Sequence, residues 1–233
     1  MISQTLYIKH RPKCLSDIIG QDHVISLLRK RISTNQIGGA YLLIGPSGCG
    51  KTSTAFALCG ELDINDMCYG EILSQSCSVE DVRDMQISMS MMPWIPNSYQ
   101  LRLVDEAHTL STPARNVFLS LLERLPERCI IIFTTTQKEA FDDVWDSRCK
   151  KLYFNEPSRK TIAILLRKIA EAEGFPKFKT LSLAHEISEN QNCNLRTALQ
   201  MLEDELLSPG SFKTAIKKRN SGRIRKIKIG GLE

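Results

Sequence analysis

The chain has 233 residues, of which 42% are hydrophobic and 24% charged, and its formal net charge is +5. This composition is ordinary for a globular protein and argues against the collagen-like, disordered and coiled-coil classes. No apolar run approaches the ~20 residues of a membrane span, and no secretory signal is visible at the N-terminus. We therefore expect a cytoplasmic protein with one large domain, or a medium domain joined to a small one.

The positive charge is concentrated in a C-terminal tail. Residues 210–233 hold eight basic side chains and one acidic one, whereas the rest of the chain holds 23 basic and 25 acidic side chains. Such a tail is typical of contact with phosphates or with an acidic partner. A solvated, disordered terminus has the same composition, so both interpretations stay open.

The eight cysteines show none of the spacings of a zinc site or a redox motif. They are Cys14, Cys49, Cys59, Cys68, Cys77, Cys129, Cys149 and Cys193. Several lie in apolar segments, where a free thiol behaves as a small hydrophobic group. We expect reduced cysteines and no zinc.

The first half of the chain alternates between helical and strand patterns. Apolar residues between Ile18 and Leu28 recur at helical spacing, and residues 41–44 form a short apolar run typical of a buried strand. A helical pattern follows from Lys51 to about Leu62, and residues 71–73 are a candidate second strand. Ser78, followed by two acidic residues, predicts the start of another helix.

The alternation continues and then stops. Residues 101–104 and 129–133 predict strands, and between them Thr112 and Pro113 predict a helix that runs to about residue 125. Strands alternating with helices indicate an α/β fold in which helices flank a parallel sheet. Beyond Pro157 only helices are expected, over residues 158–173, 181–188 and 194–207. We therefore predict an α/β domain over residues 1–156, a small helical lid domain over 157–208 and a basic tail over 209–233.

A phosphate-binding loop follows the strand at residues 41–44. Its residues, which match the pattern G-x-x-x-x-G-K-[ST], are Gly45, Pro46, Ser47, Gly48, Cys49, Gly50, Lys51 and Thr52. The glycines let backbone N–H groups surround a polyphosphate, and the helix that begins there adds its positive dipole end. Lys51 would reach the β- and γ-phosphates, and the Thr52 hydroxyl would bind Mg²⁺. The expected ligands are therefore ATP and Mg²⁺.

Two adjacent carboxylates end the strand at residues 101–104. Asp105 would bind Mg²⁺, directly or through water, and Glu106 would orient and deprotonate an attacking water. A general base at this place distinguishes a hydrolase from a kinase. A helicase with two tandem motor domains would need a much longer chain.

With these motifs the sequence resembles the AAA+ clamp-loader ATPases, such as the bacterial polymerase III gamma/tau subunits and the replication factor C small subunits. The resemblance extends from Leu6 to Leu207. The segments that carry it are Leu6–Pro12 with Ile18–Gln21, Asp105–Ser111, and the triplet Ser147-Arg148-Cys149. It implies an ATPase that loads a sliding clamp onto primed DNA during replication, in the cytoplasm or at the nucleoid or replisome.

The resemblance also implies roles for further residues. Tyr7, Arg11, Pro12 and Ile19 fall in the segment that clasps adenine in the family. Thr135 and Thr136 correspond to the first sensor of the γ-phosphate, and Arg196 to the second sensor in the lid domain. Arg148 corresponds to the arginine finger, which enters the ATP site of a neighbouring subunit. The implied partners are the clamp, other loader subunits in an oligomer, and the phosphate backbone of primer-template DNA.

Three features depart from the family pattern. The four-cysteine module of the gamma/tau subunits is missing, and Ser76, Cys77 and Ser78 stand where the family often has basic residues that track DNA. Too few residues follow Leu207 for the family's collar domain. Two alternatives stay open, namely a non-catalytic assembly subunit and another AAA+ DNA motor of the branch-migration or recombination type.

Overall fold

The computed structural model describes residues 5–91, 98–174 and 194–208. The chain divides into two compact units, one of Arg11–Pro157 and one of Met1–His10 with Ser158–Glu233. Residues 5–10, which we expected in the α/β domain, thus group with the helical unit. The reason is that the side chain of Leu6 is fully buried in the apolar core of that unit. The expected helix over residues 181–188 and the basic tail lie outside the described residues.

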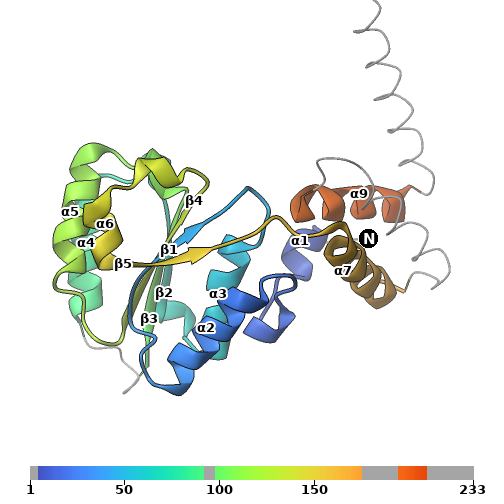
Figure 1. Cartoon of the computed structure of the whole chain (residues 1–233), viewed down its shortest axis with the longest axis horizontal. Helices are drawn as coiled ribbons and strands as arrows, with labels where there is room; N and C mark the ends of the chain where they lie inside the picture. The colour runs from blue at the N-terminus through green and yellow to red at the C-terminus, as the bar shows by residue number, and fades with distance from the viewer. Residues whose placement is uncertain (1–4, 92–97, 175–193, 209–233) are drawn as a thin grey trace, which may run out of the picture. The chain divides into compact units, whose positions relative to one another are not determined.

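The α/β unit contains a parallel sheet, as the sequence predicts, and the sheet has five strands (Figure 1). Its strands are β1 Gly39–Ile44, β2 Tyr69–Leu73, β3 Gln100–Asp105, β4 Cys129–Thr135 and β5 Cys149–Tyr153, in the order β2-β3-β4-β1-β5. β1 and β3, which end in the phosphate loop and in Asp105, therefore lie on either side of β4. β5 was not predicted, and it forms the edge beside β1.

Helices cover both faces of this sheet (Figure 1). The helices on one face are α2 Asp22–Ser33 and α3 Lys51–Glu61, and those on the other are α4 Val79–Ser90, α5 Thr112–Leu122 and α6 Asp143–Arg148. Because side chains alternate along a strand, Leu42 of β1 packs toward the second group, whereas Tyr41 and Leu43 pack toward the first.

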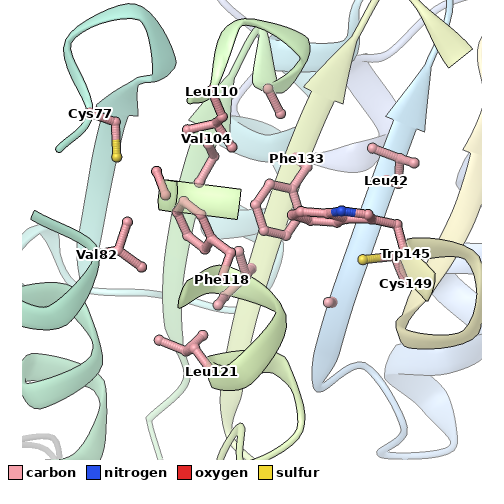
Figure 2. Packing of buried hydrophobic residues seen from close by; sticks show 14 of the residues in the cluster. Leu42, Cys77, Val82, Val104, Leu110, Phe118, Leu121, Phe133, Trp145 and Cys149 are labelled. Atoms are coloured by element: carbon pink, nitrogen blue, oxygen red, sulfur yellow. The ribbon is translucent and has the colours of Figure 1, made fainter. Parts of the chain in front are cut away.

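Aromatic rings fill the core on the side of α5 and α6 (Figure 2). The Phe133 ring of β4 packs edge to face against Phe118 at 5.2 Å and against Trp145 at 5.1 Å between ring centroids. With Phe133 on this face, strand alternation directs Thr134 to the opposite face, where α3 lies. The end of β4 is thereby fixed in register with the ends of its neighbours.

The helix starts follow their capping residues. Ser78 caps α4 in a capping box with Asp81, as the sequence predicts. α5 is capped by Ser111, one residue before the expected Thr112. α2 begins at Asp22, so Ile18 and Ile19 precede the helix instead of forming its first turn. Short 3-10 turns are η1 Leu15–Asp17, η2 Asp66–Cys68, η3 Ser74–Ser76, η4 Ala107–Thr109 and η5 Lys138–Ala140.

The described part of the helical unit contains α1 Leu6–Lys9, α7 Arg159–Ala172 and α9 Leu195–Leu207. The two long helices agree with the predicted ones, and their N-caps Ser158 and Asn194 accept hydrogen bonds from Thr161 N and Thr197 N. Their buried apolar side chains meet in one cluster, Leu6, Ile162, Leu166, Ile169, Ala170, Ala198, Leu199 and Leu202. α1 is therefore held by burial, since four residues cannot form a stable helix alone.

Candidate functional site

The loop between β1 and α3 has the backbone of a phosphate cradle. Gly48 and Gly50 have φ angles of 72° and 105°, in the left-handed region that favours glycine. A glycine is required at residue 45 because a Cβ there would lie 2.6 Å from the carbonyl oxygen of Phe154. α3 begins at Lys51, so its first N–H groups face the concave side of the loop.

Lys51 is buried within this loop, and its ammonium group points back at the backbone. Lys51 Nζ donates to Gly45 O at 2.8 Å and to Pro46 O at 2.9 Å. A polyphosphate would offer the same ammonium group stronger, charged acceptors. Ser47 is exposed, whereas Cys49 is buried, and burial raises the pKa of its thiol. Cys49 is therefore protonated at neutral pH and a poor nucleophile.

Asp105 lies beside the phosphate loop and collects two hydroxyl groups. Thr52 Oγ1 donates to Asp105 Oδ1 at 3.2 Å, and Thr134 Oγ1 donates to the same oxygen. Three segments far apart in the sequence thus place their polar side chains on the α3 face of the sheet. Sequence reasoning named Thr52 and Asp105 but assigned no role to Thr134, although alternation from the apolar Phe133 was the signal for it.

Glu106 follows Asp105 in an unusual backbone conformation. Its φ is 52° and its ψ 47°, which a residue with a side chain adopts at a cost. Three hydrogen bonds hold it there, because its N–H donates to Thr134 Oγ1 and its carbonyl accepts from the N–H and the hydroxyl of Thr109. The conformation turns the Glu106 side chain away from the line of β3, toward His108.

The two threonines expected as the first sensor differ in environment. Thr135 is buried, its hydroxyl lies 3.2 Å from His108 Nδ1, and it accepts a hydrogen bond from the N–H of Gln137. Thr136 is exposed beyond the end of β4. Of the three consecutive threonines, Thr134 is the one bonded to both Asp105 and Glu106.

This arrangement fits ATP and Mg²⁺. Mg²⁺ prefers oxygen ligands, and the Thr52 hydroxyl and Asp105 carboxylate lie 3.2 Å apart at the mouth of the loop. Glycine backbone, helix start and buried lysine together form a site for an anion. Lys51 and the loop would hold the phosphates, and Thr52 with Asp105 would hold the metal ion.

The segment expected to contact adenine is divided between the two units. Arg11, in the α/β unit, stacks on the ring of Phe56 in α3, with its guanidinium carbon 3.2 Å from the ring centroid. Pro12 and Ile19 are half-buried in the same unit. Tyr7 belongs to the helical unit, where the guanidinium carbon of Arg196 lies 5.3 Å from its ring centroid.

Gln21 ends the Ile18–Gln21 segment of the resemblance, and sequence reasoning assigned it no individual role. Its side chain is fully buried, and its amide nitrogen donates to Cys49 O at 3.2 Å and to Asn155 O at 2.8 Å. Its amide oxygen accepts from Asn155 N at 3.2 Å. Gln21 thus joins the phosphate loop to the segment that leaves β5.

Arg148 ends α6 and lies at the surface of the α/β unit. Its guanidinium forms an ion pair with Glu123, which follows α5, and donates to Val144 O at 3.1 Å. This pairing holds the pKa of the Glu123 carboxyl below its usual range. Arg148 is therefore directed toward α5 in the isolated chain.

The comparisons with known proteins agree with these motifs. The family described as "DNA polymerase III, delta subunit" matches residues 60–159. DNA polymerase III subunit gamma/tau of Mycobacterium bovis is 31% identical over 193 residues, which are 72% of this chain. The tau subunit of Escherichia coli is 28% identical over 231 residues, which are 89% of the chain.

The chain is a gamma/tau-like AAA+ protein. The resemblance found in the sequence is thereby confirmed, as is its fold class. The gamma/tau-like chain spans about a third of the length of these curated relatives, 33% of the Mycobacterium protein and 35% of the Escherichia coli one.

The solved structures agree at the level of the fold. A Thermotoga maritima RuvB Holliday junction branch migration motor superposes on the gamma/tau-like chain with a TM-score of 0.69. The match covers 83% of this chain and 64% of that one, at 19% sequence identity. This degree of identity establishes a shared AAA+ fold and does not extend to activity.

Other kinds of site are not apparent among the described residues. The seven cysteines in these ranges are free thiols, and the same ranges hold no cluster of three or more metal-ligating side chains. None of the described helices has the length and apolar character needed to cross a bilayer.

Proposed function

We propose that this chain is an ATP-hydrolysing subunit of a clamp loader. The observation that carries the proposal is that Thr52, in the first turn of α3, lies against Asp105 at the end of β3, with Glu106 next in sequence, beside a phosphate loop whose lysine is buried. Homology to the gamma/tau subunits supports the biological setting, which is DNA replication.

Each residue then has a role in cleaving the bond between the β- and γ-phosphates. Lys51 would bind these phosphates, and Thr52 with Asp105 would hold Mg²⁺, which would neutralise charge on them. Glu106 accepts a proton from the attacking water. Thr135 and Thr136 lie at the end of β4, where polar side chains would respond to the γ-phosphate.

Two arginines supply the remaining positive charge. Arg196, exposed on α9, would contact the nucleotide from the lid of the same chain. Arg148, partly exposed at the end of α6, would leave Glu123 and enter the site of a neighbouring subunit. Hydrolysis then depends on assembly, because an isolated site lacks that guanidinium group.

ATP turnover by the purified chain tests the proposal. We expect Lys51→Ala to abolish ATP binding, and Glu106→Gln to preserve binding while it lowers turnover about 100-fold or more. Glu127→Gln, at an exposed position before β4, is the matched control and should turn over ATP like the unmodified chain.

The same assay addresses clamp loading. Primer-template DNA added together with a sliding clamp should raise turnover, because the clamp loader couples hydrolysis to their release. Stimulation by neither partner would contradict clamp loading and leave an ATPase of another kind. Equal turnover by Glu106→Gln and the unmodified chain would favour the non-catalytic assembly subunit.

A further inference from the structure

Glu106 has a side-chain partner in His108. His108 Nδ1 lies 3.3 Å from Glu106 Oε2 and 3.2 Å from the hydroxyl oxygen of Thr135. The histidine side chain is 14% exposed, whereas that of Glu106 is 43% exposed. The proposed general base is therefore half in solvent, but one of its oxygens rests against a largely buried imidazole.

The surrounding hydrogen bonds define where the imidazole proton lies. Thr135 has one hydroxyl proton, and the carbonyl oxygen of Gln137, 3.1 Å away, is an acceptor for it. A carboxylate can only accept, so the contact between Glu106 and Nδ1 requires a proton on Nδ1. Nδ1–H is thus directed at Thr135, with Glu106 Oε2 close beside it, while the Thr135 proton goes to Gln137.

His108 is itself held in place from its backbone. Its carbonyl oxygen accepts from Arg115 Nη2 at 2.7 Å, and Arg115 Nη1 donates to Ala140 O at 2.7 Å. The arginine of α5 thus joins the η4 and η5 turns that follow β3 and β4. The position of His108 is consequently fixed, whereas the half-exposed side chain of Glu106 would otherwise be free to change rotamer.

We propose that His108 is a positioning residue for catalysis, which orients the Glu106 carboxylate and couples it to the end of β4 through Thr135. The inference rests on the proposed ATPase function and names a residue that acts through Glu106. With Oε2 on the imidazole, the carboxylate presents its other oxygen to the attacking water. A shift of Thr135 when the γ-phosphate binds or leaves is then transmitted to the base through a single nitrogen.

Replacing His108 by asparagine or by glutamine distinguishes a positioning role of Nδ1–H from a role in packing alone. An asparagine at residue 108 places its NH₂ group near the position of Nδ1, whereas a glutamine places it near that of Nε2. We expect His108→Gln to lower kcat about 10-fold, a part of the 10²–10⁴-fold that general bases contribute, and His108→Asn to stay within about threefold of the unmodified chain. The KM for ATP should be unchanged in both, because neither variant alters the phosphate loop.

Further variants keep the result interpretable. The melting temperatures of the two variants identify a folding defect, and Thr135→Val, which removes a hydroxyl while keeping the shape, provides a second route to a lower kcat. In a Glu106→Gln background, His108→Gln should cause no additional loss. Equal kcat for the unmodified, Asn and Gln proteins would overturn the inference while the ATPase stands. A chain that binds no ATP, or that turns none over with primer-template DNA and a sliding clamp present, would overturn the proposed function itself.

Discussion

At the scale of single residues, Gln21 is the clearest example of a buried polar group that is fully used. Both ends of its amide are bonded, to the phosphate loop through Cys49 and to the exit of β5 through Asn155. An apolar side chain here would leave two carbonyl oxygens and one N–H without these partners. The cost of such groups is about 1–3 kcal/mol each when they stay buried.

Replacing Gln21 by leucine should therefore lower both stability and nucleotide affinity. We expect the free energy of unfolding to fall by about 2–3 kcal/mol, and ATP to bind more weakly because the loop loses its support at Cys49. Urea denaturation and nucleotide titration measure the two effects. Gln36→Leu, at an exposed position, is the control, and equal effects of the two substitutions would show that the buried amide contributes nothing.

The threonines at the end of β4 mark the limit of what the sequence alone can predict about the site. The motif around Lys51 and the acidic pair at Asp105 could be located from sequence, because their spacing and flanking apolar runs are specific. Which of three consecutive threonines meets Asp105 depends on where β4 ends relative to β3. That register is a tertiary property, set by the packing of Phe133 against Phe118 and Trp145.

At the scale of elements, β5 differs from the predicted strands because its local sequence does not identify it as a strand. β1 is apolar, β4 is apolar from Cys129 to Phe133, and both are covered on both faces, so their sequences read as buried strands. β5 contains Lys150 and Lys151 and, among the described strands, pairs with β1 alone, which gives it the pattern of a polar edge. Its place in the sheet follows from pairing with β1, which local sequence does not encode.

The short helix α1 is tied to α7 by charge as well as by burial. Glu173, just after α7, accepts hydrogen bonds from Lys9 Nζ at 2.8 Å and pairs with His10 Nε2 at 2.5 Å. These contacts hold the pKa of the Glu173 carboxyl below its usual range. A depressed pKa means that the folded state favours the charged form, so this stabilisation is complete above about pH 4.5 and lost as the pH falls below it.

Glu173→Gln should accordingly destabilise the helical unit in a pH-dependent way. We expect a loss of about 0.5–1 kcal/mol at pH 7, the range of exposed ion pairs, and a difference that shrinks as the pH falls below about 4.5. Thermal melts across this range measure it. Glu171→Gln removes a looser pair with Arg167, at 3.8 Å, and should have the smaller effect; a pH-independent difference for Glu173→Gln would contradict the ion-pair explanation.

At the scale of the whole molecule, charge is distributed unevenly. The body outside residues 210–233 is slightly acidic, so the net charge of the chain gives no reason for that body to attract DNA. The phosphate loop and its carboxylates form a site for a nucleotide and not for DNA. Ser76 and Ser78, at the start of α4, provide hydroxyl groups without positive charge. We therefore propose that Coulombic attraction to a DNA backbone comes mainly from the tail.

The salt dependence of DNA binding tests this distribution. Each phosphate neutralised by a lysine or arginine contributes about −0.9 to the slope of log affinity against log salt. Replacing the eight basic residues of the tail by glutamine, in the full chain, should weaken binding of primer-template DNA and make the slope shallower by several units. A tail with the same residues in scrambled order keeps its charge and should retain the original slope, because phosphate attraction does not depend on their sequence. An unchanged slope in the glutamine variant would place the contacts on the folded units instead, where the serine hydroxyls and backbone N–H groups at the start of α4 are the first candidates.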